Sequence, residues 1–369
     1  MEPRTLGIEE ELLLVDPDTR RLAPRSQAVL QHATTLPGAA DDEQLDKELF
    51  LHQLEIRTTP LVGMDEVRRH LVLQRRSAAE SAERAGVQVA AAGTSPVASG
   101  EPEISRDDRY LAMLEEYGDV ARLAGICGMH VHVGIDSDEE GVAVIDGLAP
   151  WLPLLLAISA NSPFAEGHDT GYHSWRSQLW ARWPSVGPAE RFGSVEGYRD
   201  ACRRMIASGA ARDEKMLYFD ARLSPGNPTV EVRIADVCTD PEDALLIAAL
   251  VRALVMSLAD GPGDHEPVWR AEMLQAAKWR AARFGVSDRL LCPTTGDLRP
   301  AREVLASLVA RTRAALEACG DVDLTAEGVE RVLAGGGAAR QHAAHERSGG
   351  DFCAVVDDLV TRTNACWRG

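Results

Sequence analysis

The sequence predicts an α+β fold, in which strands and helices share the first two thirds of the chain and helices form the rest. The first observation is that apolar residues recur at alternate positions in segments 5–15 and 127–135, with Glu10 as the exception. The second is a pair of strand-like segments, 215–223 and 229–235, separated by a Pro- and Gly-containing turn. The third is helical periodicity that begins at Pro241 and continues toward the C-terminus.

The size and composition of the chain predict one domain. With 369 residues and 45% apolar side chains, the chain can bury a full hydrophobic core. No inter-domain linker and no internal repeat interrupt it. We therefore expect a single domain over residues 1–369, mainly helical from about residue 240.

The charge and the cysteines narrow the class of protein. A net charge of −18 argues against a nucleic-acid partner and against an anionic membrane, because both favour clustered Lys and Arg. The start of the chain lacks the apolar region of a signal peptide, and the apolar run 152–160 is too short to span a bilayer. The seven cysteines are scattered without a Cys-x-x-Cys pair, which is typical of reduced thiols. We expect a cytoplasmic protein.

Residues 5–15 form the first predicted strand. With a period of two, Glu9 and Glu11 project from the same face of this strand. Two neighbouring carboxylates repel each other unless a cation lies between them, so this face predicts a metal site. The alternative is an exposed edge strand with a charged face. Glu10 falls on the apolar face, where it would need a buried ion pair.

The segment 45–59 is also structured, and Pro60 ends it. Glu48 and Glu55 are seven residues apart in this segment, which would place them on opposite faces of a straight strand. Both side chains reach one site only across a bulge or a helical turn. The spacing alone therefore gives weak support for a shared role.

Residues 127–135 form the strand that carries the strongest local signal. His130 and His132 share one face, and apolar residues occupy the other. Gly128 and Gly134 would let a ligand or other backbone come close. Imidazole is both a common metal ligand and the usual proton carrier near neutral pH. The alternative is a half-buried strand whose histidines only form hydrogen bonds.

The remaining elements follow from apolar periodicity, capping residues and glycine stops. Short strands are predicted near 21–23 and at 87–92. Helices are predicted at 27–32, 64–85, 107–124, 138–147, 151–159, 195–208, 241–258, 266–284, 299–319, 325–334 and 351–367.

The segment 161–194 differs in composition from the rest. It combines three tryptophans with Arg176 and Arg182 among Gly and Pro residues. Loops of this length are usually functional or disordered, and the tryptophans argue against disorder. We predict an ordered active-site loop in which Arg176 and Arg182 face an anion. The alternative is a structural loop anchored by its tryptophans, with surface arginines.

Residues 229–235 form a third strand with functional residues on one face, because Glu231 and Arg233 lie opposite its apolar side. The residues collected from these faces are Glu9, Glu11, Glu48, Glu55, His130 and Glu231, with Arg233 beside them. Carboxylates with one imidazole suit Mg²⁺ or Mn²⁺ better than zinc. Five carboxylates exceed what one Mg²⁺ takes, so the set indicates two or three ions that hold a polyphosphate. That is a site for phosphoryl transfer. No P-loop and no Gly-x-Gly-x-x-Gly motif after a strand is present.

Several motifs in combination resemble those of one family. They are Gly7-Ile-Glu-Glu-Glu-Leu12, Leu54-Glu55-Ile56, Gly128-Met-His-Val-His-Val-Gly134, Ala160-Asn-Ser-Pro163, Gly171-Tyr-His-Ser174 and Glu231-Val-Arg-Ile-Ala-Asp236. Together they resemble the carboxylate–amine ligases of the glutamate–cysteine ligase type 2 kind, from about residue 5 to residue 284. More distantly, Gly-Met-His-x-His and Glu-x-Arg resemble the signatures of glutamine synthetase.

The resemblance implies an ATP-dependent ligase with a curved antiparallel sheet that forms a funnel, helices outside it, and two or three Mg²⁺ ions inside. The residues that match metal ligands are Glu9, Glu11, Glu48, Glu55, His130 and Glu231. Arg233 matches a phosphate-contacting arginine, His132 is expected beside the nucleotide, and Arg176 and Arg182 are the further catalytic candidates. Family members differ in substrate, so the resemblance leaves the substrate pair open.

The expected reaction joins a small carboxylate to an amine through an acyl phosphate, giving an amide, ADP and phosphate. A γ-glutamyl amide is one candidate product, and weak glutamate–cysteine ligase activity would fit. A homodimer is one candidate assembly. The rivals are a guanidine or amine phosphotransferase on the same fold, a metal-dependent hydrolase that uses His130 and His132, and a non-catalytic nucleotide-binding protein.

Overall fold

The centre of the fold is an antiparallel sheet. The computed structural model describes residues 1–33, 45–98, 100, 102–105, 107–122, 126–261 and 268–368. Among these residues the main sheet has seven strands, in the order β2-β3-β1-β5-β9-β8, with β4 paired to β1 off this path. The strands are β1 (Leu6–Val15), β2 (Leu45–Lys47), β3 (Gln53–Arg57), β4 (Gln88–Ala90), β5 (Gly128–Gly134), β8 (Ala221–Leu223) and β9 (Thr229–Asp236).

Strand β1 is central because its two faces differ in chemistry. Leu6, Ile8 and Leu12 are buried on one face, whereas Glu9 and Glu11 are only half-buried on the other. The strand pairs antiparallel with β3 on one side and with β5 on the other. The alternation therefore directs the apolar side chains into the core and leaves the carboxylates on a polar face shared by neighbouring strands.

Glu10 lies on the core side of β1, where the sequence required a partner. The Arg75 guanidinium donates to both oxygens of Glu10, at 2.8 and 2.7 Å, and neither residue is exposed. Arg75 also donates to the backbone oxygens of Cys238 and Thr239. A buried ion pair, which was one possibility for Glu10, is present, and it ties β1 to helix α2 (Met64–Arg84) and to the segment after β9.

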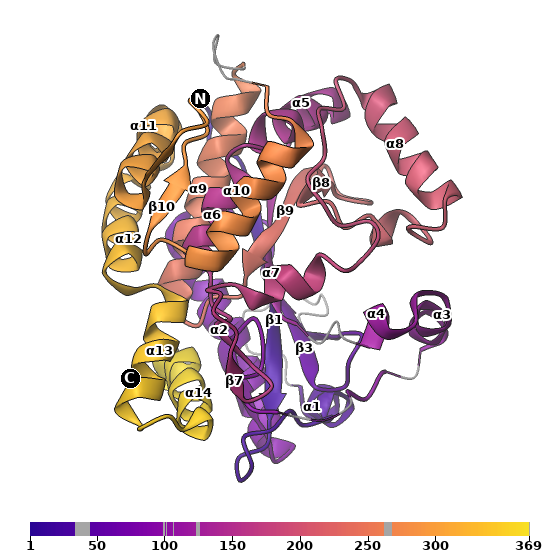
Figure 1. The fold of residues 1–369 in the computed structure, drawn as a ribbon, viewed down its shortest axis with the longest axis vertical. Helices are drawn as coiled ribbons and strands as arrows, with labels where there is room; N and C mark the ends of the chain where they lie inside the picture. The colour runs from indigo at the N-terminus through magenta and orange to yellow at the C-terminus, as the bar shows by residue number, and fades with distance from the viewer. Residues whose placement is uncertain are drawn as a thin grey trace.

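Helices cover the apolar side of the sheet. In Figure 1, α6, α9, α10, α11 and α12 gather on one side, and α13 and α14 lie below them near the C-terminus. The other helices are α1 (Ser26–His32), α3 (Asp108–Tyr117), α4 (Asp119–Arg122), α5 (Asp138–Leu148), α6 (Leu152–Ser159), α7 (Trp175–Trp180), α8 (Val195–Ala207), α9 (Pro241–Ala259), α10 (Ala271–Phe284), α11 (Ala301–Cys319), α12 (Val322–Gly335), α13 (Gly337–Arg347) and α14 (Phe352–Arg368), with a 3₁₀ turn at Glu214–Met216. Two small hairpins, β6 (Phe164–Ala165) with β7 (His168–Asp169) and β10 (Arg289–Leu291) with β11 (Leu298–Pro300), complete the fold.

The predicted α+β class, with an antiparallel sheet and helices outside it, is confirmed, and the sheet formed by the described residues is not closed. Some elements differ from the prediction. The helix predicted at 107–124 is interrupted at Gly118, whose φ of 56° is not helical. The strand predicted at 215–223 is regular only over β8, because a 3₁₀ turn occupies its start. Helix α13 lies between the helices predicted at 325–334 and 351–367, in a segment for which no helix was expected. The single-domain assignment over 1–369 stays a prediction.

In the parts of the chain that the structure describes, no single helix is long and apolar enough to cross a membrane, although the bent pair α5 and α6 meets the criterion when taken together.

Candidate active site

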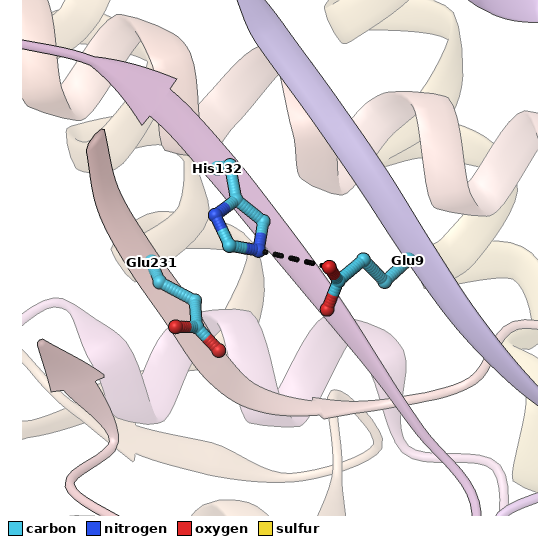
Figure 2. Close-up of side chains that lie close together, drawn as sticks. All are labelled: Glu9, His132 and Glu231. Atoms are coloured by element: carbon cyan, nitrogen blue, oxygen red, sulfur yellow. Dashed lines mark ion pairs between the residues drawn. The ribbon is translucent and has the colours of Figure 1, made fainter. Parts of the chain in front are cut away.

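Three neighbouring strands bring functional side chains together on the polar face of the sheet. Glu9 on β1 lies opposite His130 on β5, and His132 on β5 lies opposite Glu231 on β9. The Glu9 carboxylate lies 3.1 Å from His130 Nδ1 and 3.5 Å from His132 Nε2. Figure 2 shows Glu9, His132 and Glu231 pointing toward one another from these strands. Antiparallel pairing therefore converts three separate sequence motifs into one cluster.

The cluster offers two overlapping groups of metal-type ligands among the described residues. Glu9, His132 and Glu231 form one group, and Glu9, Glu55 and His130 form the other, each with ligand atoms within 4.8 Å of one another. Glu9 belongs to both groups. Mixed carboxylate and imidazole donors fit Mg²⁺ or Mn²⁺, as the sequence indicated. The structure adds His132 as a candidate ligand, whereas the sequence placed it beside the nucleotide.

Glu11 extends the cluster along β1. Its carboxylate accepts a 2.6 Å hydrogen bond from the backbone N–H of Gly128, and it lies 4.0 Å from His130 Nε2. Across the other edge of β1, Glu11 pairs in register with Glu55 on β3. Strand pairing therefore places Glu55 beside Glu11.

Glu48 lies in the connection between β2 and β3, not on a strand with Glu55. Glu48 and Glu55 are therefore not on one straight strand, and their seven-residue spacing does not force them onto opposite faces. Burial, followed by the charges of Glu55 and Glu11, raises the pKa of Glu48 well above its usual range. Burial and the Glu9 charge raise the pKa of Glu55 to about 8. A divalent cation among these carboxylates would remove the repulsion and favour their charged forms.

The pKa values of Glu9 and Glu231 are lowered, whereas those of Glu48 and Glu55 are raised. Burial alone would raise the pKa of Glu9, but the hydrogen bonds and charges of His130 and His132 outweigh it and lower the pKa. Burial likewise opposes ionisation of Glu231, yet the charges of Arg233 and Arg222 hold its pKa below its usual range. These two carboxylates are therefore ionised at neutral pH and suited to hold cations.

Arg233 projects from β9 into the same cluster. It forms an ion pair with Glu231, its Nη1 lies 3.4 Å from His130 Nδ1, and its guanidinium lies 6.0 Å from the Tyr218 ring centre. Burial opposes its charge, but Glu231 outweighs this effect and raises the pKa of Arg233. Its buried Nε has no hydrogen-bond partner among the described residues. Arg233 therefore keeps its positive charge, and its Nε N–H remains available as a hydrogen-bond donor.

The two arginines of segment 161–194 lie in different surroundings. Arg176 is only 3% exposed on α7, and its Nη1 donates to the Ile234 carbonyl at 3.3 Å. A Cβ added to Gly128 would lie 2.2 Å from Arg176 Nη2, so the guanidinium lies against the polar face of β5. Arg182 is exposed, and its side chain makes no hydrogen bond or ion pair within the parts that the structure describes. The structure therefore brings Arg176, but not Arg182, to the sheet.

Two further arginines lie at the site but were not among the candidates predicted from the sequence. Arg222 on β8 donates to both oxygens of Glu231, at 2.8 and 3.2 Å. Arg57 on β3 lies opposite Glu9 in register and donates to Glu55 at 3.2 Å. Arg222 could have been found, because antiparallel pairing of the predicted strands 215–223 and 229–235 places it near Glu231. No local signal pointed to Arg57, because its position depends on the non-local pairing of β1 and β3.

A large cavity opens at one end of this cluster. Its volume is about 1210 Å³, and it includes Glu9, Arg57 and His132 in its wall. The other end of the same face lies at Gly128 and Glu11, which do not line the cavity. The cavity therefore gives a large ligand access to Glu9 and His132. Gly7 and Gly134 also line it, so no side chain projects from the sheet at those positions.

The fold matches that of a solved ligase. The crystal structure of glutamate–cysteine ligase from Francisella tularensis in complex with AMP superposes with a TM-score of 0.72 at 14% identity, covering 100% of this chain and 90% of that one. At this identity the match shows the fold. The chain therefore has the fold of this solved glutamate–cysteine ligase, with an open antiparallel sheet that carries carboxylates, imidazoles and arginines on one face.

Sequence comparison identifies the family. The model of glutamate–cysteine ligase family 2 matches residues 5–358. "Putative glutamate--cysteine ligase 2-1" of Nocardioides sp. is 53% identical over 99% of this chain and 97% of its own length. "Putative glutamate--cysteine ligase 2-1" of Streptomyces avermitilis is 46% identical over 94% of this chain and 96% of its own length. The chain belongs to glutamate–cysteine ligase family 2, and it is an ATP-dependent ligase.

Proposed function

We propose that this protein joins a small-molecule carboxylate to an amine, with ATP converted to ADP and phosphate through an acyl-phosphate intermediate. The observation that carries this proposal is the convergence of Glu9, His130, Glu231 and Arg233 on one face of the sheet. Carboxylates that hold cations next to a fixed arginine suit the neutralisation of a transferring phosphoryl group.

The nucleotide is proposed to enter through the cavity beside Glu9 and His132. This cavity reaches the two ligand groups from one end, and its volume accommodates a molecule of that size. Divalent ions held by the carboxylates and histidines would neutralise the phosphates. The γ-phosphate would then lie near Arg233, whose guanidinium can bind two phosphate oxygens at once.

The acyl donor is proposed to bind at the opposite end of the same face, near Glu11 and Gly128. Arg176 lies there, deeply buried and with its Nε unpaired among the described residues, so it is suited to receive an anion. The carboxylate would attack the γ-phosphorus of ATP and displace ADP. The amine, on losing a proton, would then attack the acyl carbon and displace phosphate. Similarity to relatives named as glutamate–cysteine ligases makes L-glutamate and L-cysteine the first pair to test.

The test is a screen of carboxylate and amine pairs with Mg·ATP, read by phosphate release and by the mass of the product. An amide product together with ADP and phosphate is expected. A phosphorylated amine or guanidine without an amide would assign a phosphotransferase instead. AMP and pyrophosphate would contradict the acyl-phosphate route. Nucleotide binding without turnover of any pair would leave a nucleotide-binding protein.

A further inference from the structure

We infer that Asp236 and Gly128 are positioning residues that act through Arg176, holding its guanidinium over the inner end of strand β5. Asp236 supplies the counter-charge and orients the start of α7, and Gly128 provides the space in which the guanidinium lies. This inference rests on the proposed function for its kinetic consequence, but its structural part can be tested without any activity.

Asp236 first fixes the backbone of the helix that carries Arg176. Ser162 Oγ donates to Asp236 at 2.7 Å and accepts the backbone N–H of Arg176 at 3.0 Å. Ser174 Oγ donates to Asp236 at 2.8 Å and accepts the backbone N–H of Ser177 at 3.3 Å. A fully buried carboxylate therefore turns the lone pairs of both hydroxyls toward the first turn of α7.

Asp236 also faces the side chain of Arg176. Its Oδ1 lies 3.8 Å from Arg176 Nη1, and the Ile234 carbonyl accepts a hydrogen bond from that nitrogen at 3.3 Å. Asn161 donates its backbone N–H to Asp236 at 3.0 Å, which completes the surroundings of the carboxylate. The position of Arg176 is thus set from both its backbone and its guanidinium.

Gly128 determines where the guanidinium can lie. A Cβ at this position would lie 2.2 Å from Nη2, 2.7 Å from Cζ and 3.0 Å from Nε of Arg176. Real side chains do not come so close, and Arg176 is too deeply buried to turn aside into solvent. Any side chain at position 128 must therefore displace the guanidinium.

The guanidinium of Arg176 lies at the polar face of the sheet, so its position bears on the proposed site as well as on the stability of the fold. Gly128 shares its face of β5 with His130, because the two residues are two positions apart on this strand, and its own N–H donates to Glu11 at 2.6 Å. Arg176 therefore lies beside a proposed metal-binding carboxylate. Its Nε is unpaired in the described structure, so this donor is available to a ligand.

The structural test is a crystal structure of Gly128→Ala. We expect the Arg176 guanidinium to leave its place while strand β5 and the Gly128 N–H bond to Glu11 stay. A guanidinium that remains in place beside an alanine would overturn the inference. This result does not depend on catalysis, so a wild-type protein without ligase activity would contradict the proposed function alone.

The kinetic test uses Gly128→Ala and Asp236→Asn with Mg·ATP, L-glutamate and L-cysteine. Both variants should lower kcat/KM for L-glutamate by ~10²-fold, because small misplacements of a positioned group have effects of this size. The KM for ATP and the affinity for MgCl₂ should change less than about twofold, because neither residue contacts those ligands in the proposed site. Gly335→Ala is the matched control, since an added Cβ there meets nothing within 4 Å.

The dependence on Arg176 is tested with a double-mutant cycle. In an Arg176→Lys background, Gly128→Ala and Asp236→Asn should each cost less than about a further twofold in kcat/KM, because their effect passes through the guanidinium. Additive losses would overturn the inference. A lower melting temperature with unchanged kcat/KM would also overturn it, because it would assign both residues a structural role only.

Discussion

Replacing Arg233 by lysine tests whether this residue has a catalytic role or only a structural one. Arg233 shares Glu231 with Arg222, so Glu231 keeps a bidentate partner at 2.8 and 3.2 Å when Arg233 changes. Lysine keeps the positive charge but cannot bind two phosphate oxygens at once. We expect Arg233→Lys to lower kcat by ~10²-fold, about 2.7 kcal/mol of transition-state stabilisation, with a smaller effect on the KM of the carboxylate.

Arg222→Lys is the matched control on the neighbouring strand. Arg222 is buried and donates to both oxygens of Glu231 and to the backbone oxygens of Glu214, Lys215 and Leu217. A lysine ammonium would replace only part of these bonds, and losing about three of them costs ~3 kcal/mol of folding free energy. We expect a fall of about 5 °C in melting temperature. Its kcat should change less than that of Arg233→Lys.

Steady-state phosphate release and a melting curve on both variants distinguish a catalytic from a structural role of Arg233. The reasoning would be refuted if Arg233→Lys kept most of kcat and lost mainly thermal stability. Arg233 would then serve only to hold Glu231 and strand β9.

Three further predictions concern the carboxylates. Glu11→Gln should fold and bind Mg·ATP more weakly by calorimetry, and unchanged affinity in a folded variant would exclude Glu11 as a ligand. Because the pKa of Glu55 is raised to about 8, its protonated form stabilises the metal-free fold at low pH, and this stability is lost as the pH rises from about 4.5 through 8. Mg²⁺ binding at pH 7 should therefore release protons, seen as a dependence of the binding enthalpy on the buffer, and no such dependence would contradict the raised pKa. Finally, Arg75→Met should cost about 3–5 kcal/mol in chemical unfolding, since it leaves Glu10 buried without a partner, whereas a change below about 1 kcal/mol would show that Glu10 is neutralised in another way.

Local periodicity determined which side chains share a face. The period of two placed Glu9 with Glu11, His130 with His132, and Glu231 with Arg233, and the strands bear out each pairing. It also set Glu10 on the buried face, where the structure supplies Arg75. These relations hold within one strand, so they depend only on the alternation of side chains along an extended backbone.

The tertiary structure alone decided which strands became neighbours. Glu9 meets His130 because β1 pairs with β5, and Glu11 meets Glu55 because β1 pairs with β3 on its other side. Arg57 joined the site through the same pairing. Segments far apart in sequence fix these registers, and no local pattern records them.

The sequence by itself therefore determined the chemistry of the polar face and, through combined motifs, the family. Only the tertiary structure decided the distances, the pKa values and the difference between its arginines. Arg176 and Arg182 are six residues apart in a segment of uniform character, yet one is buried against β5 and the other is exposed. The physical reason is that burial and charge pairing depend on what packs against a residue, and this is set by the whole fold.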